Sequence, residues 1–148
     1  MKYIVTGGGG FLGRALCLRL AAQGHEVWSV SRGRYPQLEE HGIRGVSLDL
    51  GKNVSALAEV FPGTDAVFHT AAKIDMWGPY PEFFQTNVKG TENIISLCLA
   101  HKVRKLVFTS SPSVIADGRN LRGVNEDYPY PKRHGAFYPA TKAAAERA

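Results

Sequence analysis

The chain has 148 residues, of which 44% are hydrophobic and 21% charged, and its formal net charge is +5 at pH 7. This composition excludes an intrinsically disordered chain, and the length suits one domain with one core. The basic residues are scattered, and no apolar run approaches the length of a membrane span, so we expect neither a nucleic-acid partner nor a membrane-spanning segment.

Short apolar runs alternate with helical patterns along the chain. The predicted strands are 3–5, 27–30, 46–48, 66–68 and 106–108, and the predicted helices are 11–23, 54–61 and 81–100, with a further helix near Tyr138. Strands that alternate with helices predict an α/β fold of Rossmann type, a doubly wound parallel sheet with helices on both faces.

The two longer helices have apolar faces that predict which residues are buried. The expected inward residues are Leu12, Ala15, Leu16 and Leu20 in the first helix, and Phe84, Val88, Ile95 and Leu99 in the second. The segment 111–136 is different, because it holds three prolines, three glycines and many polar residues. A loop of this length in a compact domain is usually functional.

Cysteines and histidines give no sign of a disulfide or a metal site. Cys17 and Cys98 each lie in an apolar helical pattern, which favours two reduced, buried thiols. The five histidines have no ligand spacing, and the stretch MKYIVTGGGG has too short an apolar run for a signal peptide. We therefore expect a cytoplasmic protein without a bound metal.

A glycine-rich loop joins the first strand to the first helix, in the stretch TGGGGFLG. Gly7 permits a tight turn, Gly10 lets the backbone approach a pyrophosphate, and Gly13 lets the helix pack close to the strand. The free N–H groups around Phe11 and Leu12 and the helix dipole would then meet the phosphates. This position in the chain favours a dinucleotide-binding site over a purely structural turn.

The end of the second strand predicts which dinucleotide is bound. An acid there would bind the ribose 2′-hydroxyl of NAD, but this chain has Ser31 and Arg32, with Arg32 nineteen residues after Gly13. A guanidinium and a hydroxyl suit a 2′-phosphate, so NADP(H) is preferred and NAD(H) remains possible if Arg32 points to solvent. Asp49, before Leu50, either accepts from the adenine amino group or caps a turn.

Tyr138 and Lys142, in YPATK, have the spacing of a proton-transfer pair. A lysine four residues on lies one helical turn away, and its ammonium would favour a phenolate at neutral pH. Ser110 and Ser111 follow the fifth strand, at the edge where ligands bind in parallel sheets. Pro139 disfavours a helical backbone at Tyr138, so we expect the tyrosine at the very start of its helix.

These motifs together resemble the extended short-chain dehydrogenase/reductase superfamily over the whole chain. TGGGGFLG is similar to its TGxxGxxG motif, YPATK to its YxxxK motif and FTSS to its active-site serine segment. The resemblance implies that Ser111 is the catalytic serine, with Ser113 as the alternative, that Tyr138 is the acid/base, and that Lys142 assists Tyr138 and binds the ribose hydroxyls.

Two further segments take roles from the same resemblance. Asn87, in TNVKGTENII, resembles the helix asparagine that maintains a proton relay. HTAA, residues 69–72, resembles the segment whose backbone lines the cofactor site, which implies cofactor contacts for Thr70, Ala71 and Ala72 and a structural role for His69.

Within the superfamily the chain is more like the 3β-hydroxysteroid dehydrogenase branch than the sugar-nucleotide epimerases. The epimerases usually carry V-Y-G after the serines, where this chain has Val114, Ile115 and Ala116. Five stretches together are most similar to bacterial 3-oxo-acid reductases of olefin biosynthesis: GGGGFLGRALC, SRGRYP, HTAAKIDMWG, SPSV and HGAFYPATK. This resemblance implies a hydrophobic small-molecule substrate bordered by DMWGPY, in which Trp77 either forms an apolar wall or covers the sheet edge.

The resemblance therefore implies an NADP(H)-dependent oxidoreductase that interconverts a ketone and a secondary alcohol. The alternatives are a sugar-nucleotide epimerase or dehydratase that retains NAD, and a non-catalytic dinucleotide sensor. Members of the superfamily continue past the YxxxK motif into further strands and a substrate domain. Residues 1–148 are thus expected to be a dinucleotide-binding domain that is incomplete at its C-terminus, from a protein that is a homodimer at full length.

Overall fold

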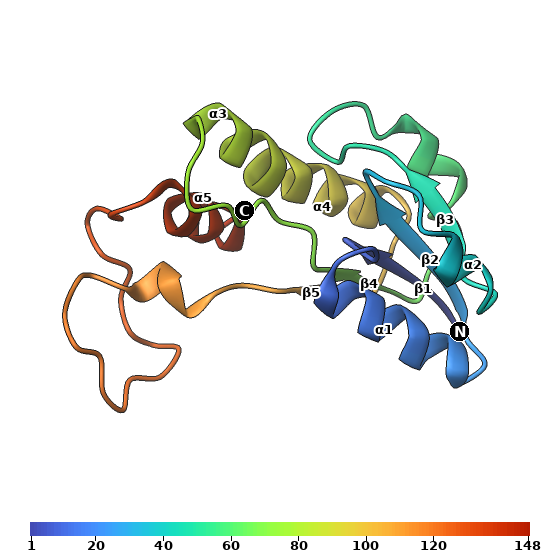
Figure 1. Ribbon diagram of the computed structural model, residues 1–148, viewed down its shortest axis with the longest axis horizontal. Helices are drawn as coiled ribbons and strands as arrows, with labels where there is room; N and C mark the ends of the chain where they lie inside the picture. Colours follow the sequence, from blue (N-terminus) through green and yellow to red (C-terminus); the bar gives the residue numbers. More distant parts are fainter.

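The computed structural model describes residues 1–148 and contains one five-stranded parallel sheet. The strands stand in the order β3-β2-β1-β4-β5, so the chain starts in the middle of the sheet and winds outward in both directions (Figure 1). Their bounds are β1 Lys2–Thr6, β2 Glu26–Ser31, β3 Arg44–Ser47, β4 Ala66–His69 and β5 Lys105–Phe108. The predicted doubly wound Rossmann architecture is confirmed.

Helices cover both faces of this sheet. Helix α1 (Phe11–Ala22) and the short α2 (Pro36–Glu39) lie on one face, and α4 (Gly90–Ala100) lies on the other (Figure 1). Residues 54–61 form a 3₁₀ helix, η1 (Ser55–Glu59), in place of the predicted α-helix. The remaining elements are α3 Tyr80–Phe83, η2 Phe84–Lys89, η3 Pro112–Ile115 and α5 Phe137–Glu146.

The core is divided into two layers because side chains alternate along the strands. In β1, Ile4 faces the α4 layer and Val5 faces the α1 layer, and both are fully buried. This burial on both faces explains the continuous apolar run in the sequence. The α4 layer contains Ile4, Val30, Leu50, Leu57, Val60, Phe61, Val67, Ile94 and Cys98, and the α1 layer Val5, Cys17, Val27, Leu38 and Ile43.

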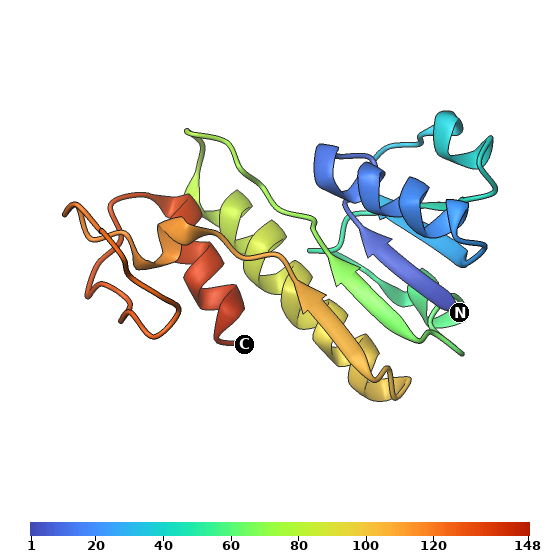
Figure 2. The same cartoon turned by 90° about the horizontal axis from the view of Figure 1, so that it is seen from below.

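The strand register brings the carboxyl ends of the strands to one edge of the sheet. Thr6 in β1 pairs with Val30 on one side and His69 on the other, and His69 pairs with Phe108. The consecutive elements α3, η2 and α4 form one long helix, residues 80–100. Helix α5 lies beyond the carboxyl edge of the sheet, next to the α3 end of this long helix (Figure 2). The glycine loop and the helix carrying Tyr138 therefore converge on the same end of the sheet.

The predicted buried face of α1 is partly wrong. Gly13 and Cys17 are its buried residues, and Leu16 and Leu20 are half-buried as expected, but Leu12 and Ala15 are exposed. The reason is that α1 must approach the backbone of the glycine loop at Gly13, so small residues rather than leucines form the contact. Leu12 turns toward the cavity described below.

The second helix is also rotated from its predicted face. Val88 is buried, but the contact continues through Thr91, Ile94 and Cys98, while Leu99 is 74% exposed. This buried face carries the polar side chains of Asn87 and Thr91, whose polar atoms have hydrogen-bond partners. A search for apolar residues alone therefore predicts the wrong face of the helix. Phe84–Lys89 also winds as a π-helix, a form common at functional sites.

Smaller differences affect the third strand and the long loop. The third strand ends at Ser47, so Leu48 lies outside it. Residues 116–136 contain no helix or strand, as predicted for this loop, but Pro112–Ile115 forms a turn of 3₁₀ helix. No helix of the structure is both long and apolar enough to cross a membrane.

Candidate cofactor and active site

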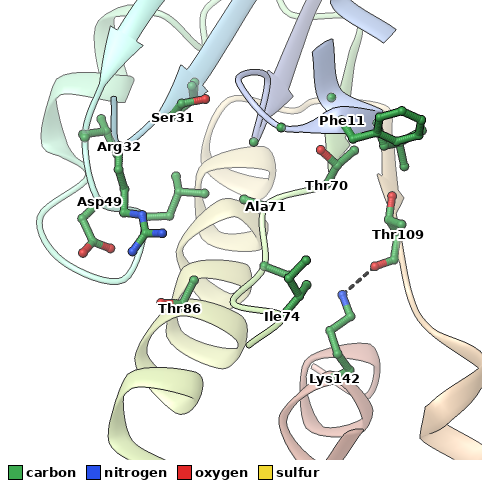
Figure 3. A pocket seen from close by; sticks show the side chains of 18 of the residues that line it. Phe11, Ser31, Arg32, Asp49, Thr70, Ala71, Ile74, Thr86, Thr109 and Lys142 are labelled. Atoms are coloured by element: carbon green, nitrogen blue, oxygen red, sulfur yellow. Dashed lines mark hydrogen bonds between the residues drawn. The ribbon is translucent and has the colours of Figure 1, made fainter. Parts of the chain in front are cut away.

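A cavity of about 440 Å³ opens at the carboxyl edge of the sheet. Figure 3 shows it between the ends of β1, β2 and β4, the long helix and α5. Its lining comprises Gly7, Gly10, Phe11, Leu12, Gly13, Val30, Ser31, Arg32, Tyr35, Leu48, Asp49, Leu50, Thr70, Ala71, Ala72, Ile74, Thr86, Thr109, Ser110, Tyr138 and Lys142. All predicted cofactor-binding residues belong to this lining.

The glycine loop places a helix N-terminus at the cavity. Gly10 precedes α1 without a side-chain cap, and the first bond of the helix runs from the N–H of Arg14 to the carbonyl of Gly10. The N–H groups of Phe11, Leu12 and Gly13 therefore have no intrahelical acceptor. An uncapped N-terminus with no acidic side chain in its first turn suits an anion.

Close backbone approach requires glycine in this loop. Gly7 has φ +70°, and an added Cβ would lie 2.9 Å from the backbone of Ala71. At Gly13 an added Cβ would lie only 2.2 Å from the carbonyl oxygen of Gly7. The loop is thus a bare-backbone cradle at the entrance to α1, which fits the pyrophosphate of a dinucleotide.

The end of β2 supports both the loop and the far side of the cavity. The N–H of Gly9 donates to Ser31 Oγ at 3.0 Å, which leaves the Ser31 proton free to be donated. The ring of Tyr35 lies directly against Gly9, where an added Cβ would overlap it. Arg32 extends into the cavity on the same side as Asp49 (Figure 3).

The turn after β3 is held by the long helix. Asp49 Oδ1 accepts from the N–H of Gly51 at 3.0 Å, so Asp49 caps this turn while also lining the cavity. Gln85 Nε2 donates to the carbonyl of Gly51, and Asn93 Nδ2 donates to the carbonyl of Leu50 at 2.7 Å. Leu50 is buried in the core beneath them.

Thr70, Ala71 and Ala72 pass the cavity directly after β4. Thr70 Oγ1 donates to the carbonyl of Thr6 at 2.7 Å, and the N–H of Ala71 donates to Thr6 Oγ1 at 3.3 Å. These bonds hold the segment against the glycine loop, in the backbone-lining position expected from the sequence.

Lys142 is nearly inaccessible to solvent, with 3% of its surface exposed. Its Nζ donates to the carbonyl of Thr109 at 2.5 Å and lies 4.0 Å from the centroid of the Phe108 ring (Figure 3). Burial lowers the pKa of Lys142 to about 8, and the negative charge of Glu146 opposes this shift. Half-buried Tyr138 lines the same cavity at the start of α5.

The predicted serine lies beside the cavity rather than in its lining. Ser111 Oγ is 2.8 Å from Ser113 Oγ and accepts from the N–H of Ser113 at 3.3 Å, as the cap of the 3₁₀ turn η3. The lining residues of this segment are Thr109 and Ser110. Pro112 follows Ser111 and starts the turn.

Asn87 is also outside the lining, but it joins the elements that form the site. It is 2% exposed, its Oδ1 accepts from the N–H of Lys73 at 2.7 Å, and its Nδ2 donates to the carbonyl of Lys73 at 3.1 Å. The same Nδ2 donates to Thr141 Oγ1 at 3.0 Å. Asn87 thus connects the π-helix to the segment after β4 and to α5.

His69 forms a buried relay behind the cavity. Thr91 donates its proton to the carbonyl of Asn87, so Thr91 Oγ1 accepts from His69 Nε2–H, and His69 Nδ1 accepts from Thr6 Oγ1 at 2.6 Å. Burial first, and then the charge of Lys142, lower the pKa of His69 to about 4. The ring is therefore neutral and structural, and no cluster of His, Cys, Asp and Glu in the chain could hold a metal.

Sequence reasoning missed several lining residues: Val30, Tyr35, Leu48, Ile74, Thr86 and Thr109. Most of them directly precede or follow a predicted site residue, so extending each motif by one residue would have found them. Tyr35 and Ile74 are different, because only the packing of their loops brings them to the cavity.

An exposed apolar loop lies next to the cavity. Ile74, Met76 and Trp77 are 71%, 84% and 86% exposed. Lys73 fixes the base of this loop through ion pairs with Asp75 at 2.6 Å and Glu82 at 3.1 Å. The loop DMWGPY therefore presents apolar side chains to solvent near the Tyr138 end.

Known proteins are similar to this chain in sequence and in fold. A 2-alkyl-3-oxoalkanoate reductase from Shewanella oneidensis is 46% identical over 143 residues, which cover 97% of this chain and 37% of that protein. A short-chain dehydrogenase/reductase superfamily protein from Agrobacterium tumefaciens, solved with bound NAD, has a TM-score of 0.85 and 30% identity, covering 99% of this chain and 43% of that one. A UDP-galactose 4-epimerase has a TM-score of 0.86 and 31% identity, covering 99% and 50%.

The chain spans 37% and 45% of the length of two curated relatives, both of them 2-alkyl-3-oxoalkanoate reductases. The family model of the 3-beta hydroxysteroid dehydrogenase/isomerase family matches residues 4–148. By this match, the chain belongs to the 3-beta hydroxysteroid dehydrogenase/isomerase family.

Proposed function

We propose that the protein is an NADP(H)-dependent oxidoreductase that interconverts a ketone and a secondary alcohol on a hydrophobic substrate. One observation carries the proposal. The uncapped N-terminus of α1 and the Tyr138–Lys142 pair of α5 face one cavity, which would bring a bound pyrophosphate and the proton-transfer side chains into the same space. The oxidoreductase names among the relatives and the NAD in a solved neighbour support this proposal.

The chain supplies the binding groups for the cofactor. The N–H groups of Phe11, Leu12 and Gly13 would hold the pyrophosphate, and Lys142 would meet the nicotinamide ribose. When bound, the nicotinamide would supply or accept the hydride. Arg32 and the free Ser31 proton would bind a 2′-phosphate, and no acid stands at the end of β2 to repel it.

Side chains of the protein would transfer the proton that accompanies hydride transfer. Tyr138 would donate its phenolic proton to the carbonyl oxygen in reduction and remove the hydroxyl proton in oxidation. A charged Lys142 favours the phenolate that remains. Ser111 is proposed to hydrogen-bond the substrate oxygen, and Asn87 to keep α5 in place through Thr141.

The exposed loop supports an apolar substrate. Ile74 lines the cavity, and Met76 and Trp77 continue the apolar surface away from it. A 3-oxo/3-hydroxy acid with a long alkyl chain, or a sterol-like molecule, would cover these side chains. Removing their apolar surface from water would favour binding of such a substrate. We propose a homodimer for the full-length protein.

A second candidate is a sugar-nucleotide epimerase, which the likeness to a solved UDP-galactose 4-epimerase favours. An epimerase keeps its cofactor through turnover, whereas a reductase releases the oxidised cofactor in proportion to product. The segment Val114-Ile115-Ala116 departs from the epimerase pattern. The ratio of NADP⁺ released to product formed separates the two candidates.

The test uses the full-length protein with NADPH and a long-chain 3-oxo acid. Tyr138→Phe removes the proton donor, so kcat should fall by about 10²- to 10⁴-fold while NADPH affinity is retained. Tyr3→Phe is the matched control, since Tyr3 lies on β1 outside the cavity lining. Activity that survives Tyr138→Phe would exclude the proposed mechanism.

A further inference from the structure

Glu146 lies two helical turns after Tyr138 and one turn after Lys142, so the three residues follow one side of α5. Its Oε2 accepts from Ser110 Oγ at 3.0 Å. Burial and then the charge and hydrogen bond of Glu146 raise the pKa of Tyr130, and the guanidinium of Arg147 lies 4.7 Å from the Tyr130 ring. The carboxylate thus joins α5 to the exit of β5 and to the long loop.

Lys142 has no charged group in direct contact with its ammonium. Its immediate neighbours are the carbonyl of Thr109, the Phe108 ring, and neutral His69 on β4. Each is uncharged, and burial alone would favour a neutral amine. Glu146 supplies the one carboxylate whose charge acts on Lys142, through space rather than through a direct ion pair.

We propose that Glu146 is a positioning residue for the Tyr138–Lys142 pair, which keeps Lys142 an ammonium and holds the β5 exit through Ser110. This inference rests on the proposed function, because only an ammonium favours the phenolate of Tyr138. The Ser110 bond acts on the same geometry, since Ser110 follows Thr109, whose carbonyl accepts from Lys142.

The direct test is the titration of Lys142 in the full-length protein, followed by NMR of ¹³C-labelled lysine side chains. The Lys142 signal is assigned by its loss in Lys142→Met. Glu146→Gln removes the charge but keeps a side chain that can accept from Ser110, so the midpoint of Lys142 should fall by roughly half a pH unit or more. Glu92→Gln, which removes a charge on α4 where Glu92 pairs with Lys89, should leave it unchanged.

Kinetics give the second readout. If Glu146 keeps Lys142 charged, the alkaline limb of the kcat profile moves to lower pH in Glu146→Gln by the same amount as the NMR midpoint. A purely structural role would lower the melting temperature without moving that limb. An unchanged Lys142 midpoint in Glu146→Gln would overturn the inference. A lowered midpoint in a protein that reduces no ketone would support the inference and refute the proposed function.

Discussion

The ammonium group of Lys142 is almost inaccessible to solvent, and burying this charge lowers the free energy of unfolding. Its pKa is about 8 in the folded chain and near 10.5 in the unfolded chain, so the unfolded state binds more protons between these values. Stability therefore rises with pH from 8 to 10.5, and below pH 8 the buried charge costs about 3 kcal/mol. Such a cost is typical of a group retained for function.

Lys142→Met should accordingly stabilise the protein at pH 7 while abolishing turnover. The expected gain is about 1–2 kcal/mol, because the lost hydrogen bond to the Thr109 carbonyl offsets part of the charge burial. The gain should fall as the pH rises from 8 to 10.5, because the lysine loses its charge first in the folded state and is half-neutral in the unfolded state at pH 10.5. Urea unfolding at pH 7 and pH 10 measures it, and a variant less stable than wild type at pH 7 would contradict the argument.

His69 gives a dependence of the same sign on the acid side, because its pKa is also lowered in the folded chain. Its pKa is about 4 when folded and 6.5 when unfolded, so below pH 6.5 only the unfolded chain takes up the proton. Stability should fall by about 2 kcal/mol between pH 7 and pH 5 from this group alone. His69→Gln removes the titration, and the difference between the two pH profiles isolates it from the acidic residues. Parallel profiles would show that His69 is not buried as a neutral ring.

At the scale of elements, the site depends on how closely α1 approaches β1. The glycines permit close backbone contacts that any side chain would prevent. Asn87 fixes the position of α5, because it hydrogen-bonds Lys73 after β4 and Thr141 on α5 at the same time. A loop, a π-helical turn and a helix start are therefore held in fixed relation. The cavity exists because these three connections meet at one edge.

Gly13→Ala should damage both stability and cofactor binding. Its Cβ would lie 2.2 Å from the Gly7 carbonyl oxygen and 2.9 Å from Gly8 Cα, which are backbone atoms that cannot turn aside. We expect a loss of about 1–3 kcal/mol, as for an overpacked core, together with weaker NADPH binding. Gly135→Ala adds the same methyl group in open space and is the control. Chemical unfolding and NADPH titration of both variants measure the difference.

The whole molecule is a platform whose strand ends converge on one cavity. A ligand that binds only the folded state stabilises it by mass action. The cavity is lined by the end of β2, by the segments that follow β1, β3, β4 and β5, and by residues of α1, η2 and α5. Occupation of the cavity should therefore oppose unfolding of the entire sheet.

NADPH should therefore raise the melting temperature, by about 5–10 °C at a hundredfold excess over its dissociation constant. NADH at the same concentration should give a smaller rise, since it lacks the phosphate proposed to meet Arg32. In Arg32→Ala the two cofactors should give similar rises. If NADH stabilises the wild type more than NADPH does, the cofactor preference is wrong.

Much of this fold follows from the sequence because the signals are local. Tyr3-Ile4-Val5 is apolar on both faces since β1 is central. The glycines stand between a strand and a helix, which is typical of a phosphate-binding turn. The residues predicted to bind the cofactor all line the cavity, because most of them lie at or shortly after the carboxyl end of a strand. The spacing of Tyr138 and Lys142 placed them on one helix face.

Only the tertiary structure decided features that depend on contacts between distant segments. The buried side of the long helix was missed because Asn87 and Thr91 are polar, and their burial is stabilised by partners on β4, after β4 and on α5. The contacts of Glu146 with Ser110 and the burial of Lys142 against Phe108 likewise join residues more than thirty positions apart. Local pattern reports what a segment prefers, whereas burial, hydrogen-bond partners and the pKa of a lysine depend on what the rest of the chain brings against it.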